Sequence, residues 1–372
     1  MVDDRRITLT RGPFSGLRPE KAIARERGGW AGPLVAPPAN VKQKEPFLPS
    51  PRPVGEALGV RQSGAALLMA LVVAAIATVI VSGLFWRQFV LVRTIENQQL
   101  MSQSRLLLRG ALDWARSILR EDAAQTHYTA FTAPWAQPLA ETHLDQLGES
   151  SALASQATMS GSIEDAQSRF NLRNLVNTGT VGKTKTEHDV LARLASELSL
   201  PEPTADLITA YVQQTALPNV TPVGVPAAAR PTQALPLVFP ADLAMIPGLD
   251  PAVASRLAPY VVMLDQSNTL VNFNTASAEV IAAEVLGLSL SDARALVADR
   301  DRIPFNGTGD LTNRLVKWGS GLSANDASVS SQYFFVRGEI KLQRADTRME
   351  ALVVRAPLGQ VGPVNILWER EL

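Results

Sequence analysis

The sequence contains no cysteine and only three histidines, which are far apart in the chain. The absence of cysteine excludes thiol catalysis, disulfide bonds and cysteine-based metal sites. His127, His143 and His188 do not have the spacing of a metal-binding motif. The 35 basic and 35 acidic residues balance, so the net charge favours neither nucleic acid nor an acidic substrate as a partner.

Catalytic motifs are missing as well, because the chain has no G-x-S-x-G, H-E-x-x-H or G-x-x-x-x-G-K sequence. Carboxylates are frequent between residues 279 and 310, but none has the spacing of an EF-hand calcium loop. These carboxylates are Glu279, Glu284, Asp299, Asp301 and Asp310. We interpret them as surface carboxylates and predict that the protein is not an enzyme.

One long apolar segment is the strongest feature of the sequence. Residues 65–86 contain no charged side chain, while Arg61 precedes them and Arg87 follows. As a helix they would extend ~33 Å, enough to cross a hydrocarbon core of ~30 Å. Because a helix satisfies its own backbone hydrogen bonds in lipid, we predict a membrane span rather than a buried helix of a soluble domain.

The helical pattern continues beyond this span to about Asp122. Apolar residues recur at steps of three and four, and charged residues occupy the opposite face. The sequence therefore predicts one unbroken helix, with a first half in lipid and a second half packed against protein.

Short strands and helices are predicted in the remainder. Residues 127–150 are interpreted as a loop with short helical pieces. A hairpin is predicted with strands near 156–163 and 168–172, on turn signals at Ser160-Gly161 and Glu164-Asp165. Three further strands are predicted between 331 and 372, two of them joined by a turn around 344–346.

Two helical hairpins are predicted between these strands, at 242–264 and 272–300, with Asn274, Thr275 and Ser277 as N-cap residues of the second. They resemble the helix-hairpin-helix of DNA-binding proteins, in which a glycine–apolar–glycine turn holds a phosphate. Gly248 and Gly287 mark the two turns, but Asp250 and Ser289 stand where the second glycine is needed, which argues against this use. A membrane-anchored nucleic-acid-binding or DNA-uptake protein is the alternative interpretation.

The sequence RQSG before the span is similar to the class III leader of pilins and pseudopilins. This resemblance implies that a membrane peptidase cuts between Gly64 and Ala65, and that Ala65 becomes the methylated N-terminus. Most members of the family have a glutamate five residues into the mature helix, where this chain has Met69.

The leader is longer than is usual in this family. A start at Val54 or Val60 would give a short basic leader, and an appended cytoplasmic tail is the other explanation.

Four segments together resemble the K-type minor pseudopilin of the type II secretion system over residues 61–372. They are the leader junction, SRFNLRNLV, LAPYVVML with NFNTASAEVIAA, and the final strands. The resemblance implies an α+β fold, with a long N-terminal transmembrane and amphipathic helix packed on an antiparallel sheet. It also implies that a large all-α insertion of two SAM-like subdomains interrupts this pseudopilin fold.

The implied organisation is as follows. The leader comprises 1–64, the N-terminal helix 65–122, the first part of the α/β domain 123–175, the helical subdomains 176–267 and 268–327, and the last strands 328–372.

The resemblance also implies a function and a set of partners. Members of this family are taken to sit at the pseudopilus tip and to initiate its assembly, and the missing glutamate at Met69 is a trait of the K type. The implied partners are the I- and J-type minor pseudopilins, the major pseudopilin, the prepilin peptidase and the inner-membrane assembly platform, with no nucleic acid. Calcium is the only cofactor that the resemblance implies, and the sequence assigns no ligands to it.

Overall fold

The computed structural model describes residues 63–147, 154–176, 186–216, 234–317 and 326–372. Most of the predicted leader therefore lies outside the described residues. The α-helices are α1 (Ser63–Gln125), α2 (Glu187–Glu197), α3 (Pro203–Ala216), α4 (Pro251–Leu257), α5 (Ala278–Glu284), α6 (Leu290–Arg302) and α7 (Thr308–Val316). The strands are β1 (Leu139–His143), β2 (Ala157–Asp165), β3 (Phe170–Asn171), β4 (Val261–Val262), β5 (Tyr333–Leu342), β6 (Ala345–Val354) and β7 (Asn365–Glu371).

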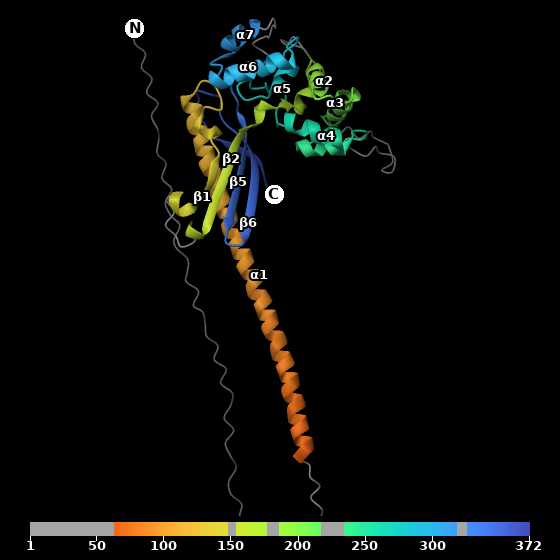
Figure 1. Ribbon diagram of the computed structural model, residues 1–372, viewed down its shortest axis with the longest axis vertical. Helices are drawn as coiled ribbons and strands as arrows, with labels where there is room; N and C mark the ends of the chain where they lie inside the picture. The colour runs from red at the N-terminus through yellow and green to blue at the C-terminus, as the bar shows by residue number, and fades with distance from the viewer. Residues whose placement is uncertain (1–62, 148–153, 177–185, 217–233, 318–325) are drawn as a thin grey trace, which may run out of the picture. The chain divides into compact units, whose positions relative to one another are not determined.

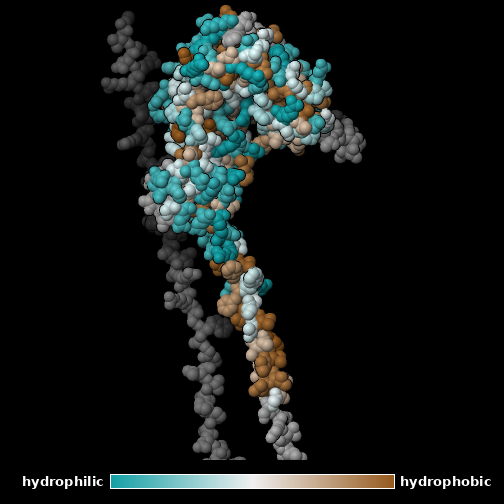
Figure 2. Space-filling model, viewed as in Figure 1, coloured by the Kyte–Doolittle hydropathy of each residue, from teal (hydrophilic) through white to brown (hydrophobic). Residues whose placement is uncertain are grey.

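Helix α1 is continuous over 63 residues, which confirms the prediction of one unbroken helix (Figure 1). It ends at Gln125, three residues beyond the predicted end. Its most apolar 18-residue window has a mean hydropathy of 2.7 and no buried residue, so by length and composition this helix can cross a membrane. Hydrophobic side chains cover the N-terminal part of α1 in Figure 2.

A five-stranded antiparallel sheet has the strand order β1-β2-β5-β6-β7. The central neighbours β2 and β5 are far apart in the sequence, since β2 ends at Asp165 and β5 begins at Tyr333. The chain between them forms the helical insertion. Together, α1, the sheet and the insertion make the α+β fold that was predicted.

The predicted hairpin at 156–172 is wrong. Ser160 and Gly161, which were read as a turn, lie inside β2, and β2 pairs with β1 and β5. Of the second predicted strand, only Phe170 and Asn171 form a strand, β3, which pairs in parallel with β4 in a separate two-stranded sheet. Strand β1 lies in the segment that was interpreted as a loop with short helical pieces.

The three C-terminal strands are confirmed as β5, β6 and β7. Strands β5 and β6 form a hairpin whose turn contains Gln343 and Arg344, close to the predicted turn. Gln343 has a φ of 54°, a left-handed conformation that a tight turn between antiparallel strands commonly requires.

The helical insertion contains both predicted helical hairpins. In the first, the short 3-10 helix η7 (Pro240–Met245) precedes α4, and in the second α5 precedes α6. Gly248 and Gly287 turn the chain with φ values of 85° and 79°, which favour glycine. Both halves of the insertion contribute to one apolar core, together with Phe170, Leu172 and Leu175. The RFNLRNL segment therefore packs with the helices and lies outside the five-stranded sheet.

Candidate assembly surfaces

The N-terminal part of α1 exposes the residues of the predicted processing site. Gly64 and Ala65 lie in the first turn of the helix, and both are exposed. A side chain added at Gly64 would meet no atom within 4 Å. Met69 is 72% exposed, so nothing within the described chain covers the position where most family members have a glutamate.

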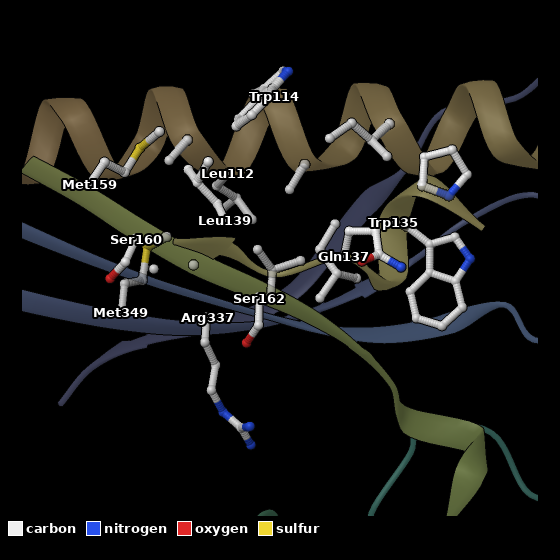
Figure 3. Close-up of a pocket in the computed structure, with 18 residues that line it drawn as sticks. Leu112, Trp114, Trp135, Gln137, Leu139, Met159, Ser160, Ser162, Arg337 and Met349 are labelled. Carbon is white, nitrogen blue, oxygen red and sulfur yellow. The ribbon is translucent and has the colours of Figure 1, made fainter. Parts of the chain in front are cut away.

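The C-terminal part of α1 packs on one face of the sheet through apolar side chains. Leu108 and Leu112 of α1 are 1% and 2% exposed and belong to the same core as the sheet residues Met159, Val336 and Met349. Figure 3 shows Leu112 directed from α1 toward β2, with Trp114 directed away from the sheet. This burial of apolar surface holds the helix on the sheet.

A pair of glycines allows this close contact. Gly161 of β2 lies opposite Gly338 of β5 in the register. A Cβ at Gly338 would lie 3.2 Å from Leu108 Cδ2, and a Cβ at Gly161 would lie 2.8 Å from the Arg337 carbonyl oxygen. Gly161 was read from the sequence as a turn residue, but it lies inside β2, where the backbone of β5 leaves no room for a Cβ.

Polar contacts fix the direction of α1 along the sheet. Near its middle, Arg344 donates to Glu96 at 3.0 Å and to Asn97 at 2.7 Å. The hydrogen bond from Arg344 lowers the pKa of Glu96. Near the helix end, the buried Arg355 donates to the Leu119 carbonyl oxygen at 3.3 Å. The turn between β5 and β6 thus lies beside the middle of α1. The opposite ends of these two strands, next to the insertion, lie beside the C-terminal turns of α1.

A buried polar joint connects the sheet to the insertion, and Asp165 is at its centre. The Asp165 carboxylate accepts hydrogen bonds from Asn272 Nδ2 at 2.8 Å, Thr275 Oγ1 at 2.6 Å and Ser331 Oγ at 2.6 Å. Its second oxygen accepts from the Gln167 backbone N–H at 2.8 Å. These donors come from the beginning, the middle and the end of the insertion, so the joint ties all three parts to the end of β2.

The polar residues of the NFNTAS segment hold this joint and its surroundings together. Asn272 also donates to the Thr129 carbonyl oxygen at 3.1 Å, which ties in the segment after α1. Asn274 donates to and accepts from the backbone of Phe305, both at 2.8 Å. Of the three predicted N-cap residues, only Ser277 caps α5. Thr275 belongs to the joint, and Asn274 holds the backbone of Phe305.

The electrostatics of the joint reflect its burial. Burial raises the pKa of Asp165, and the hydrogen bonds from Ser331, Thr275 and Asn272 partly oppose this shift. Burial likewise lowers the pKa of Arg355, whose guanidinium forms an ion pair with Asp122 at 2.5 Å. Buried groups of this kind require such partners, because an unpaired polar group away from water costs free energy.

The tips of the helical hairpins are closed by their own side chains. Asp250 accepts a hydrogen bond from the Ala252 N–H, and Ser289 accepts one from the Asp292 N–H. The amides that would hold a phosphate in a helix-hairpin-helix are therefore already occupied, by a carboxylate in the first case. This geometry opposes the nucleic-acid alternative.

Of the five carboxylates that were interpreted as surface groups, four form ion pairs and Glu284 is not on the surface, because it is 5% exposed. Asp299 and Asp310 both pair with Arg314, Asp301 pairs with Arg300, and Glu279 lies 3.8 Å from Arg294. Within the part of the chain that the structure describes, no group of three or more His, Cys, Asp or Glu residues could hold a metal ion. The described residues thus assign no ligands to calcium.

Sequence reasoning missed Asp165, Ser331 and Arg355 as functional residues. Asp165 was assigned to a turn, where a carboxylate would be solvated. The available signal was the run of small polar residues in FNTAS and SVSSQ, which is unusual next to apolar segments. Their pairing with Asp165 spans more than one hundred residues, so local patterns do not show it.

Comparison with known proteins gives consistent results. Two family models, both described as "Type II secretion system (T2SS), protein K", match residues 168–266 and 271–330. A type II secretion system protein K from Pseudomonas aeruginosa is 29% identical over 322 residues, which cover 82% of this chain and 92% of that protein. A protein K from Pectobacterium carotovorum is 26% identical over 314 residues, covering 79% and 92%.

A solved structure shares the fold. It is a chain of the GspK–GspI–GspJ complex from the enterotoxigenic Escherichia coli type 2 secretion system, with a TM-score of 0.58 and 22% identity. The match covers 74% of this chain and 98% of that chain.

Proposed function

We propose that the chain, a minor pseudopilin of the protein K family of type II secretion systems, occupies the pseudopilus tip. There it initiates assembly and supports the export of folded proteins across the outer membrane. The observation that carries this proposal is the helical insertion between the adjacent strands β2 and β5. Subunits that stack along their N-terminal helices leave room for such a bulky insertion only at the end of the stack.

The buried joint at Asp165 supports this role. It connects the insertion to the sheet through several hydrogen bonds, so the insertion is held as part of a rigid head. A rigid head blocks further subunits more effectively than a freely moving one.

The exposed part of α1 supports anchoring in the bacterial inner membrane. We place the N-terminus in the cytoplasm before cleavage and the remaining domain in the periplasm. The prepilin peptidase cuts between Gly64 and Ala65, and Ala65 is then methylated. The exposure of both residues is consistent with access by the peptidase.

Met69 fits a tip subunit for an electrostatic reason. A glutamate buried in lipid needs a partner, such as the N-terminal amine of a neighbouring subunit. A subunit with no neighbour above it avoids an unpaired charge when this position is apolar. Met69→Glu is therefore expected to reduce secretion and tip placement, whereas Met69→Leu should leave both unchanged. Normal secretion and tip placement with the glutamate would contradict this explanation.

The partners proposed here are the I- and J-type minor pseudopilins, the major pseudopilin and the inner-membrane assembly platform. The similar fold of a chain from the GspK–GspI–GspJ complex supports the first two.

N-terminal mass spectrometry of the protein from its native membrane is the first test. We expect a methylated N-terminus at Ala65. The variant Gly64→Val should accumulate with its leader intact, while Gly83→Val, in the same helix, should still be processed. An intact leader in the native protein, or a cut near residue 85, would refute the pseudopilin maturation proposed here.

A further inference from the structure

A second surface lies on the face of the sheet opposite α1. A cavity of about 280 Å³ is formed there between the sheet and the insertion. Its walls include Arg169, Arg337, Glu350, Trp368 and Arg370. Alternate residues of β5 and β6 pack under α1, so Arg337 of β5 and Glu350 of β6 project from the other side of the sheet. Trp368 and Arg370 come from β7, and Arg169 directly precedes β3.

The charged groups of this cavity do not balance. Glu164 accepts a hydrogen bond from Arg169 at 3.0 Å and forms an ion pair with Arg337. Glu350 accepts from Arg337 at 2.8 Å and from Arg370 at 2.9 Å. Three guanidinium groups thus share two carboxylates. The cluster has one positive charge in excess, which a further carboxylate would pair.

The like charges also affect one another. The pKa of Arg169 is lowered, first by burial and also by the neighbouring charge of Arg337. The Arg169 side chain is only 22% exposed, so water screens this repulsion less than at an open surface. An additional anion would relieve it.

Aromatic rings give the cavity an apolar wall. The Arg370 guanidinium lies 4.3 Å from the ring centre of Phe239 and 5.7 Å from that of Trp368. The two rings meet edge to face at 5.0 Å. A ligand that fits this wall carries apolar atoms next to its carboxylate, as a peptide does.

Strand β7 is the edge of the sheet and also supplies two residues to the cavity. The Leu372 N–H donates to the Arg348 carbonyl oxygen at 3.1 Å, so by alternation the backbone groups of Glu369 and Glu371 are directed away from β6. Those backbone groups can pair with another strand. The side chains of Glu369 and Glu371 face Arg109 and Arg105 of α1, at 4.0 Å and 2.6 Å.

We propose that β7 binds an extended acidic segment of a partner polypeptide. The segment pairs with the open edge of β7, and one of its carboxylates enters the arginine cluster beside Trp368 and Arg370. Backbone pairing supplies affinity and the cavity selects the acidic side chain, because alternate residues of an added strand lie on the cavity side. The inference rests on the sheet and the cavity and is independent of the tip position proposed above.

The test uses the full chain in detergent micelles and two labelled peptides, acetyl-Thr-Val-Thr-Glu-Thr-Val-Thr-amide and the same peptide with glutamine at the centre. Fluorescence anisotropy should show about tenfold tighter binding of the glutamate peptide. Arg169→Gln, which removes the excess charge, should abolish this preference. Arg348→Gln removes an exposed arginine outside the cavity and should retain the preference.

The mode of binding is tested separately. Glu369→Pro removes an outward N–H and should weaken both peptides about tenfold, while Glu369→Ala should not. In the unaltered chain, peptide binding should slow hydrogen exchange of the Glu369 and Glu371 amides. Equal affinity for the two peptides, binding of neither, or binding without protection of β7 would each overturn the proposal.

Discussion

Two carboxylates of the same sheet are almost equally buried, yet their surroundings differ in charge. Asp165 is 3% exposed and receives its hydrogen bonds from neutral groups, whereas Glu350 is 5% exposed and lies between Arg337 and Arg370. Burial raises the pKa of Asp165. Burial also favours a higher pKa for Glu350, but the hydrogen bonds from Arg370 and Arg337 outweigh it and lower the pKa.

The comparison shows that burial alone does not decide how a carboxylate behaves. Neutral donors hold Asp165 by geometry, which suits a joint that connects the insertion to the sheet and excludes water. Arginines hold Glu350 by charge, and their excess over the carboxylates leaves this region able to bind a further anion. The surroundings of Asp165 are therefore internal and closed to water, whereas those of Glu350 can form a contact surface.

The largest expected effect is that of Asp165→Ala. The substitution leaves the donors of Asn272, Thr275 and Ser331 without their acceptor, so we expect the free energy of unfolding to fall by about 3–5 kcal/mol. Urea denaturation of the full chain in detergent, followed by tryptophan fluorescence, measures this change. Asp113→Ala removes an exposed carboxylate of α1 and should change the free energy by less than about 0.5 kcal/mol. A decrease in the free energy of unfolding below about 1 kcal/mol for Asp165→Ala would show that water can replace Asp165 in the joint.

A smaller loss is expected for Glu350→Gln. The glutamine retains the shape but removes the charge that pairs with Arg370, so we expect a loss of about 1–2 kcal/mol. Because this region is partly exposed, the loss should shrink in 1 M NaCl, where the Debye length is about 3 Å. The effect of Asp165→Ala should not change with salt. An equal change of both stability losses in 1 M NaCl would contradict the difference in charge between the surroundings of Asp165 and Glu350.

The smallest expected effect is a difference in pH dependence. The pKa of Asp165 is raised in the folded state, so its contribution to stability is complete below its unfolded value of about 3.9 and is lost as the pH rises through the folded pKa. The pKa of Glu350 is lowered, so its contribution is present above about 4.3 and is lost as the pH falls through the folded pKa.

The two pH profiles can be separated by difference measurements. The free energy of unfolding of the unaltered chain minus that of Asp165→Asn should decrease from pH 3.5 to pH 7. The corresponding difference for Glu350→Gln should increase over the same range. Slopes of the same sign would mean that the two carboxylates have similar environments after all.

The sequence predicted the elements whose signal is local. The length of the apolar run predicted α1, the glycines at 248 and 287 marked the turns of both helical hairpins, and the alternation after residue 331 predicted three strands. The RFNLRNL segment was misassigned because its apolar residues fit a strand pattern, while Phe170 and Leu172 pack into the helical core.

By itself, the sequence thus determined a long helix whose apolar run is long enough to span a membrane, both helical hairpins and the three C-terminal strands, because periodicity and length act within a few turns of chain. Only the tertiary structure decided that β2 pairs with β5, that Gly161 and Gly338 lie under α1, and that Asp165 meets Asn272, Thr275 and Ser331. These contacts join residues more than one hundred positions apart. Their partners are chosen by burial and hydrogen-bond geometry in the folded chain, which no local pattern encodes.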